Sequence, residues 1–216
     1  DRNESADAAR DIVVMVLAGG EGQRLTLDAA TGKALYASCA ACHGVQAEGI
    51  AAMNAPALAG QEAAYIERQL AHFQAGVRGA DPADTLGAQM RGMAAVLADT
   101  QAIADVSAYL AALAPMSSAS DAGGDLRNGN NYYQSKCGAC HGGKAEGNAA
   151  LFAPRLAGQD SAYLKRQYLN FQQGLRGAHP QDKYRRQMKM MSAALPCTGV
   201  LMATRSAARR RLLSLL

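Results

Sequence analysis

Apolar side chains recur at helical spacing in several segments of this chain, and no stretch alternates apolar and polar residues as a strand would. The clearest examples are residues 62–74, 160–172 and 99–113, where aliphatic or aromatic residues return every three or four positions. Residues 31–42 and 129–140 can form two further helices, each leading into a cysteine motif. The pattern predicts an all-α protein.

The two halves of the chain are copies of one another. A shift of 98 residues carries the segment from Cys39 to about Leu97 onto the second half without a gap, and "CAACHG" at 39–44 falls on "CGACHG" at 137–142. The same shift superposes further identical pairs, among them Glu48 and Glu146, Pro56 and Pro154, Tyr65 and Tyr163, Phe73 and Phe171, and Met90 and Met188. A tandem duplication of this kind predicts two similar domains.

The repeat also divides the chain. We expect one domain at 28–114 and a second at 125–195, joined by a small and polar linker at 115–124. Residues 1–27 form an N-terminal extension without a cysteine motif of its own. Residues 196–216 form an Arg-rich tail that has lost the apolar spacing of the helix closing the first half, and a frameshift is a reasonable hypothesis for this change.

The formal net charge of +4 comes from the tail. The tail holds four arginines and no acid, and the rest of the chain carries 18 basic and 18 acidic residues. This balance gives no support to nucleic-acid binding. The arginines allow peripheral association with an anionic membrane, although a solvated tail is the favoured interpretation.

The Cys-x-x-Cys-His motifs carry the chemistry. A zinc site needs four ligands, whereas each half offers one cysteine pair and one adjacent histidine, and a thioredoxin-like dithiol needs a βαβ setting. The same spacing suits covalent haem, because the two thiols add to the haem vinyl groups and the histidine binds the iron. We therefore expect two haem c groups, attached through Cys39, Cys42, Cys137 and Cys140, with His43 and His141 as iron ligands. Aromatic residues make up only 5% of the chain, so haem would also fill the two cores.

The sixth iron ligand decides what a haem can do. A methionine opposite the histidine raises the reduction potential and closes the iron, which suits electron transfer. Met90 and Met188 each lie 47 residues after the histidine of their motif. Met93 and Met191 repeat at the same shift and are the rival pair, and Met190 adds a third candidate in the second half.

Four repeated arginines have a weaker claim to a role: Arg68, Arg78, Arg166 and Arg176. They could neutralise the haem propionates, which are anions beside an apolar cofactor. For any single one of them, a solvated surface charge is the favoured interpretation.

Both motifs and the segments after them, "EGIAAMNAPALAGQEAAYIERQL", "EGNAALFAPRLAGQDSAYLKRQY" and "QMRGMAAVL", resemble the cytochrome c4 family of di-haem periplasmic cytochromes c. The resemblance covers about residues 30–195. It implies that the first methionine of "QMRGM" is the ligand, which is Met90 and, through the repeat, Met188. It also implies two c-type domains about an approximate two-fold axis, with haems close enough to exchange electrons.

The function that we expect is electron transfer without substrate turnover, in the periplasm, where covalent haem attachment takes place. The partners are then a redox-protein donor and acceptor, and the resemblance implies a haem-copper terminal oxidase on the membrane as acceptor. The alternative is a cytochrome subunit or domain that accepts electrons from a periplasmic dehydrogenase. A di-haem peroxidase or a haem sensor needs an open iron, against which the paired methionines argue.

Overall fold

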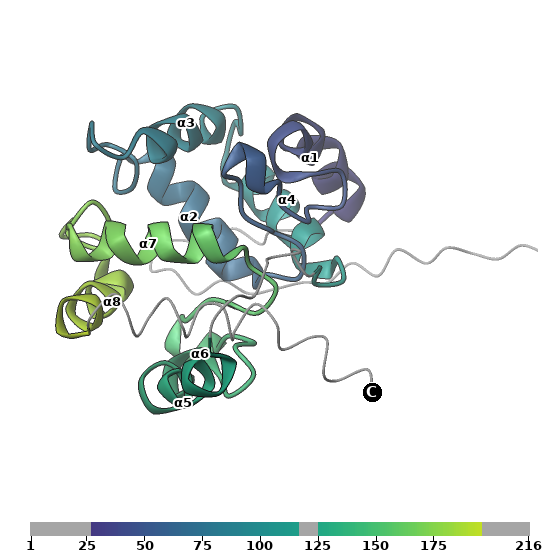
Figure 1. Cartoon of the computed structure of the whole chain (residues 1–216). Coiled ribbons are helices and arrows are strands. Elements are labelled where there is room, and N and C mark those ends of the chain that lie inside the picture. Colours follow the sequence, from purple (N-terminus) through teal and green to yellow (C-terminus); the bar gives the residue numbers. More distant parts are fainter. Residues whose placement is uncertain (1–26, 117–124, 196–216) are drawn as a thin grey trace, which may run out of the picture.

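The computed structural model describes residues 27–116 and 125–195, which form two groups of helices joined by loops (Figure 1). The first half contains α1 (Ala29–His43), η1 (Ala51–Met53), α2 (Ala63–Gln74), α3 (Thr85–Ala94) and α4 (Thr100–Ala112). The second half contains α5 (Leu126–Lys136), α6 (Gly138–His141), η2 (Ala149–Leu151), α7 (Ser161–Gln172) and α8 (Lys183–Ala194). Within these ranges strand-like pairing is limited to two isolated bridges, Ile50 with Ala55 and Asn148 with Ala153. The predicted all-α class is confirmed.

The periodic segments 62–74, 160–172 and 99–113 correspond to α2, α7 and α4. Helices α3 and α8 are not predicted by the apolar pattern, because α3 contains two glycines and α8 is rich in basic side chains. The expectations for the N-terminal extension, the Arg-rich tail and most of the linker lie outside the described residues. None of the described helices is long and apolar enough to span a bilayer.

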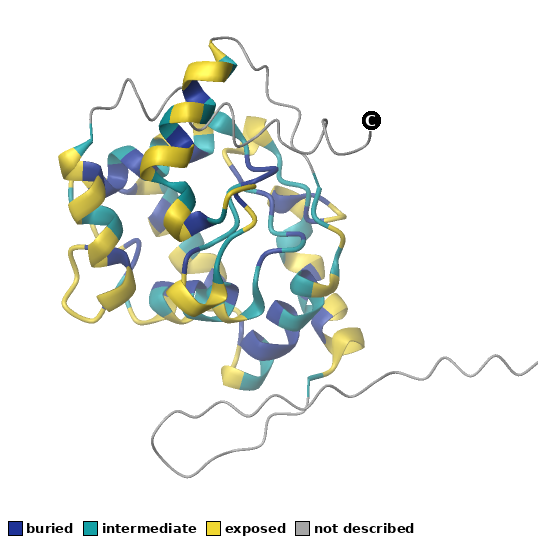
Figure 2. Cartoon of the chain, turned by 90° about the horizontal axis from the view of Figure 1, so that it is seen from below, coloured by how far each residue is buried: buried dark blue, intermediate teal, exposed yellow. Residues whose placement is uncertain are grey.

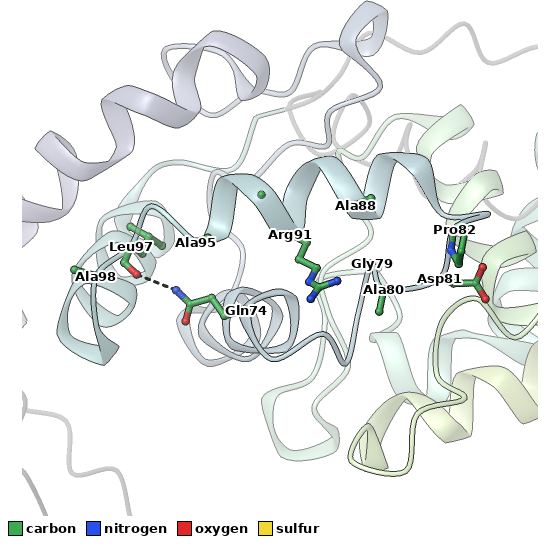
Figure 3. A pocket seen from close by; sticks show the side chains of 11 residues that line it. Gln74, Gly79, Ala80, Asp81, Pro82, Ala88, Arg91, Ala95, Leu97 and Ala98 are labelled. Atoms are coloured by element: carbon green, nitrogen blue, oxygen red, sulfur yellow. Dashed lines mark hydrogen bonds between the residues drawn. The ribbon is translucent and has the colours of Figure 1, made fainter.

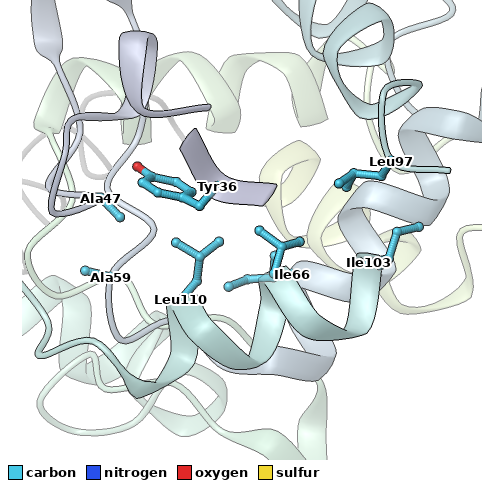
Figure 4. Close-up of a cluster of buried hydrophobic side chains, with 8 residues drawn as sticks. Tyr36, Ala47, Ala59, Ile66, Leu97, Ile103 and Leu110 are labelled. Atoms are coloured by element: carbon cyan, nitrogen blue, oxygen red, sulfur yellow. The ribbon is translucent and has the colours of Figure 1, made fainter. Parts of the chain in front are cut away.

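The first half is closed by the packing of α4 on α1. The two helices approach closely at Gly32, where a Cβ atom would collide with the main-chain carbonyl of Asp105. Behind this crossing lies a cluster of buried apolar side chains (Figure 4): Tyr36, Ala47, Ala59, Ile66, Leu97, Ile103, Val106 and Leu110. Three of these residues belong to α4, so the closing helix supplies a large part of the core.

The second half has a much smaller core within its described residues, 125–195. Its buried cluster consists of Tyr133, Ala145 and Ala157, and this range contains no helix equivalent to α4. The buried residues of both halves lie on the inner faces of the helices and in the loops between them, while the outer faces are exposed (Figure 2).

One inserted residue interrupts the helix that leads into the second cysteine motif. Tyr36 donates a hydrogen bond to the carbonyl of Gly44 (2.6 Å) and Tyr133 donates one to the carbonyl of Gly142 (2.7 Å), so the two tyrosines are equivalent. Tyr36 lies three residues before its motif, whereas Tyr133 lies four before Cys137. The helix cannot keep both the tyrosine contact and the motif in register.

The backbone absorbs the additional residue at Cys137, whose φ of −118° and ψ of −35° separate α5 from α6. The prediction of one continuous helix over 129–140 is therefore wrong at this position. The next residue, Gly138, stands where the first half has Ala40, and glycine costs about 1 kcal/mol relative to alanine inside a helix.

Two glutamines join the halves reciprocally. The side-chain oxygen of Gln159 accepts a hydrogen bond from the N–H of Ala57 (3.1 Å), and its amide nitrogen donates to the carbonyl of the same residue. Gln61 does the same to Arg155, with distances of 2.9 and 3.1 Å. These four residues are related by the repeat, so the contact has the form expected of two domains about an approximate two-fold axis.

We predict that the second domain unfolds before the first as denaturant rises. Ile103, Val106 and Leu110 of α4 are buried in the first core, and burying such a side chain contributes about 1.5–3 kcal/mol each. The tail sequence offers no matching apolar spacing. Hydrogen exchange read by mass spectrometry, at increasing denaturant, reports the opening of each domain separately.

A chimaera provides the control for this order. Replacing 196–216 by a copy of 98–113 should remove or reverse it, because the second domain then gains a closing helix. If both domains open together in the natural chain and the replacement changes nothing, the tail already closes the second domain and the prediction is wrong.

Candidate haem-binding sites

Each cysteine motif lies at the end of a helix. Cys39 and Cys42 lie in the last turns of α1, three residues apart, so their side chains lie on one face of the helix. The first thiol is half-buried and the second is exposed. Helix α6 begins directly after Cys137 and carries Cys140. Among the described residues all four cysteines are free of disulfides.

The histidine after each pair is buried and held by a single hydrogen bond. Nδ1 of His43 lies 2.9 Å from the carbonyl oxygen of Pro56, and Nδ1 of His141 lies 2.9 Å from that of Pro154. A carbonyl can only accept, so Nδ1 carries the proton and Nε2 keeps its lone pair. Burial lowers the pKa of both histidines, which keeps the rings neutral. A neutral ring with Nδ1 fixed by a carbonyl is the arrangement that metal-binding histidines use.

The first thiol of each pair does not have the character of the reactive thiol of a redox dithiol. Burial raises the pKa of Cys39, and burial raises the pKa of Cys137 to about 11. A reactive dithiol needs a depressed pKa and a stable thiolate. Within 27–116 and 125–195 there is also no group of three or more His, Cys, Asp or Glu side chains that could hold a metal ion. Each motif therefore offers one imidazole and two thiols, the set that a covalent haem requires.

The structure places the candidate methionines on separate helices from the cysteine motifs. Met90 lies on α3 and Met188 on α8, and both side chains are half-buried. The exposed fraction is 41% for Met93, 42% for Met191 and 64% for Met190. Met90 and Met188, the iron ligands that the sequence favours, are thus also more buried than their rivals.

Two buried arginines, Arg78 and Arg176, hydrogen-bond to glutamines of α2 and α7. Arg78 and Arg176 are both buried, so the interpretation as solvated surface charges is wrong for these two. Each donates to the glutamine of its own half at 2.7 Å, Gln69 for Arg78 and Gln167 for Arg176. Each also donates to the glutamine of the other half, at 3.1 and 3.0 Å. The domains are thereby joined a second time by reciprocal contacts.

A third guanidinium joins this group from α8. Arg185 is buried against Asp182, with 3.4 Å between Nη1 and Oδ1. The repeat does not predict this arginine because the first half has Gly87 at the equivalent position, although an arginine in place of a glycine inside a matching stretch is itself a signal.

The arginine group is short of anions. The Nε atoms of Arg78, Arg176 and Arg185 are buried and have no hydrogen-bond partner among the described residues. Burial raises the pKa of Tyr65, but the surrounding arginines more than offset this and bring it down to about 7. A buried excess of positive charge with unused N–H donors fits carboxylate groups, and each haem carries two propionates. The residues present therefore fit haem in two respects: the histidines can bind its iron, and the arginines can pair with its propionates.

A cavity of about 780 Å³ opens beside α3 in the first half (Figure 3). Its lining includes Gln74, Asp81 and Arg91, and the Gln74 side chain donates to the carbonyl of Leu97 at 2.9 Å. None of the cysteines, histidines or methionines considered above lines it. The cavity is therefore separate from the candidate haem ligands.

Comparison with known sequences places both halves in one family. The Cytochrome c family model matches residues 29–114 and 126–198. Cytochrome c4 of Azotobacter vinelandii is 35% identical over 162 residues, which cover 69% of this chain and 74% of that protein. The thiosulfate dehydrogenase electron acceptor of Stutzerimonas stutzeri is 34% identical over 186 residues, which cover 82% of each chain.

Solved structures agree. Reduced recombinant cytochrome c4 from Pseudomonas stutzeri has a TM-score of 0.68 and 28% sequence identity, covering 84% of this chain and 98% of its own. Thiosulfate dehydrogenase from Marichromatium purpuratum has a TM-score of 0.66 and 30% identity, covering 84% of this chain and 39% of its own.

The predicted pair of tandem c-type domains is thus confirmed, and with it the two covalent haem c groups. Both matched regions contain a Cys-x-x-Cys-His motif with a buried histidine. The chain belongs to the cytochrome c4 family of di-haem electron-transfer cytochromes c.

Proposed function

We propose that this protein is a periplasmic shuttle that passes single electrons from a redox-protein donor to a respiratory terminal oxidase, with no substrate turned over by the chain itself. The observation that carries the proposal is the duplicated histidine geometry, in which each ring is buried and its Nδ1 is bound to a backbone carbonyl. Two equivalent sites of this kind in one chain suit the transfer of electrons in single steps.

The residue roles follow from the two motifs. When bound, each haem supplies an iron centre that gains and loses one electron. We assign the thioether bonds to Cys39, Cys42, Cys137 and Cys140, the proximal iron bonds to His43 and His141, and the distal iron bonds to Met90 and Met188. The burial of both methionines relative to their rivals supports the last assignment.

The protein holds the two sites in a fixed relation. Pro56 binds His43, and the next residue, Ala57, is bound by Gln159 of the other domain. Through the repeat, Pro154 binds His141 and its neighbour is bound by Gln61. Each imidazole is therefore one residue away from an interdomain hydrogen bond, which limits its movement when the charge on the iron changes.

The propionates have a place in this arrangement. We assign them to the arginine group, in which Arg78 and Arg176 retain unused Nε donors at the domain interface. A carboxylate there would complete the hydrogen bonding of the guanidinium groups and reduce their mutual repulsion. Anions from both haems would then meet at the same interface.

Charge differs between the two domains, although residues 1–195 taken together carry equal numbers of basic and acidic side chains. Residues 27–116 hold four basic and eight acidic side chains, whereas 125–195 hold eleven basic and four acidic ones. Opposite charges on two domains steer differently charged partners to each of them. This supports separate docking of a donor and an acceptor.

A second candidate has its own support. The relative that matches 82% of both chains is described as a thiosulfate dehydrogenase electron acceptor, and a thiosulfate dehydrogenase structure also shares the fold. In this version the protein accepts electrons from a dehydrogenase. The residue roles given above are the same in both versions.

Electron transfer to membranes distinguishes the two functions. We expect the reduced protein to be oxidised rapidly by membranes that contain a terminal oxidase, in a cyanide-sensitive reaction followed by stopped-flow absorbance. The rate should fall as salt is added, because screening weakens the steering between charged surfaces. Rapid reduction by thiosulfate dehydrogenase and thiosulfate, with no oxidation by the membranes, would replace the lead proposal with the second candidate.

We predict that both haems stay on the polypeptide when the denatured protein is extracted with acidified organic solvent. The double variant Cys39→Ser/Cys42→Ser should retain one covalent haem instead of two, and Cys137→Ser/Cys140→Ser should do the same for the other site. Intact-protein mass spectrometry and haem absorbance count the groups. Complete extraction of haem from the natural chain would disprove covalent attachment.

We predict that Met90→Ala lowers the potential of one haem and opens its iron to carbon monoxide, because the thioether ligand is lost. Met93→Ala is the matched control, since it removes an exposed methionine one turn further along α3 and should change neither property. Spectroelectrochemistry and carbon monoxide binding measure both effects. If Met93→Ala gives the ligand-loss spectrum and Met90→Ala does not, the assignment is reversed.

A further inference from the structure

The repeat breaks its symmetry at one buried position of the domain interface. Arg185 of α8 stands where α3 has Gly87, and only 4% of the arginine is exposed. Its guanidinium carbon lies 5.1 Å from the centre of the Tyr65 ring, in the other domain. The second domain thus places one additional positive charge in the interface.

The neighbouring aspartates show that the two positions are not interchangeable. In α3, Asp84 caps the helix by accepting a hydrogen bond from the N–H of Gly87 (3.0 Å), and a Cβ atom at Gly87 would collide with that carboxylate. In α8, Asp182 makes no side-chain cap and instead pairs with Arg185. Of these two equivalent aspartates, Asp84 caps its helix and Asp182 is the counter-ion of an arginine.

The surroundings of Asp182 make the pair of Asp182 and Arg185 electrostatically different from Asp84 and Gly87, the equivalent residues of the first domain. His72 also faces Asp182, with 3.7 Å from Nδ1 to Oδ1, but burial lowers the pKa of His72 and favours its neutral form. Burial lowers the pKa of Arg185 only to about 10, so this side chain stays charged at neutral pH. The second domain therefore sets a positive charge against Asp182, whereas the first domain has a glycine, Gly87, at the position of Arg185.

The additional charge belongs to the helix of the second distal ligand. Arg185 precedes Met188 by three residues, so both lie on one face of α8, and Gly87 precedes Met90 by the same interval. A positive charge near a metal centre favours its reduced form. Solvent screens a buried charge only weakly, so the effect extends further than that of a surface arginine.

We propose that Arg185 makes the two haems inequivalent: its buried charge raises the reduction potential of the second haem above that of the first and directs electrons from the first domain to the second. The inference rests on the proposed function, in particular on Met188 as a distal ligand. It adds a residue that sets the direction of internal transfer.

The test compares Arg185→Gln with Arg186→Gln in the di-haem protein. Both variants remove one positive charge from the same helix, but Arg186 is exposed. In a spectroelectrochemical titration the natural chain should show two midpoint potentials. Arg185→Gln should lower the higher midpoint and bring the two together, whereas Arg186→Gln and the charge-retaining Arg185→Lys should keep them apart. The Met90→Ala background identifies the first haem by its altered spectrum.

Asp182→Asn provides a second test with the opposite sign, which does not depend on the folding of Arg185→Gln. It removes the counter-ion, so the midpoints should move further apart. Haem content and the methionine–iron near-infrared band are measured on the same samples. If both haems and both bands are present and neither variant changes the separation, or if Arg185→Gln lowers the lower midpoint instead, Arg185 does not set the potentials. Loss of a haem or of a band from the natural chain would instead disprove the proposed function.

Discussion

The hydrogen bond from a buried histidine to a proline carbonyl is the constraint on which the rest of each domain depends. It orients the ring of His43 or His141, fixes which nitrogen carries the proton, and leaves the other nitrogen for iron. The carbonyl must stay in place, so the loop after each proline is bound to a glutamine of the other domain. Coordination geometry within a domain and docking between domains are therefore parts of one hydrogen-bonded chain.

Duplication explains both the symmetry of this interface and where it fails. Contacts that depend on the shape of the motif occur twice, as the bonds from Tyr36 to Gly44 and from Tyr133 to Gly142 show. The inserted residue before the second motif is tolerated only because the helix breaks at Cys137. The second domain thus preserves the hydrogen bond from its tyrosine to the motif at the cost of a continuous helix, which indicates that the motif geometry constrains the fold more strongly than helix continuity does.

The sequence predicts much of this because the relevant signals are local. Cysteine and histidine spacing within five residues specifies covalent haem, and apolar periodicity identifies α2, α4 and α7. Helix α8 is not predicted because the residues that it buries are Arg185 and Ser192, which leaves no apolar stripe to detect. Local sequence signals do not predict the arginine group, because its burial arises only in the assembled interface. The residues of each reciprocal contact are separated by 89 or more positions.

Charge at the interface connects structure to electron flow. A buried guanidinium needs anions, and the described part of the chain supplies fewer than its three buried interface arginines require. The propionates of both haems would supply these anions, so the cofactors themselves would complete the domain interface. Among the differences between the two repeats, Arg185 is the one that adds a buried charge on the helix of a distal ligand, so it can distinguish two identical cofactors. Equal potentials would let an electron rest on either haem, whereas a charge fixed on one side of the interface gives the pair a direction.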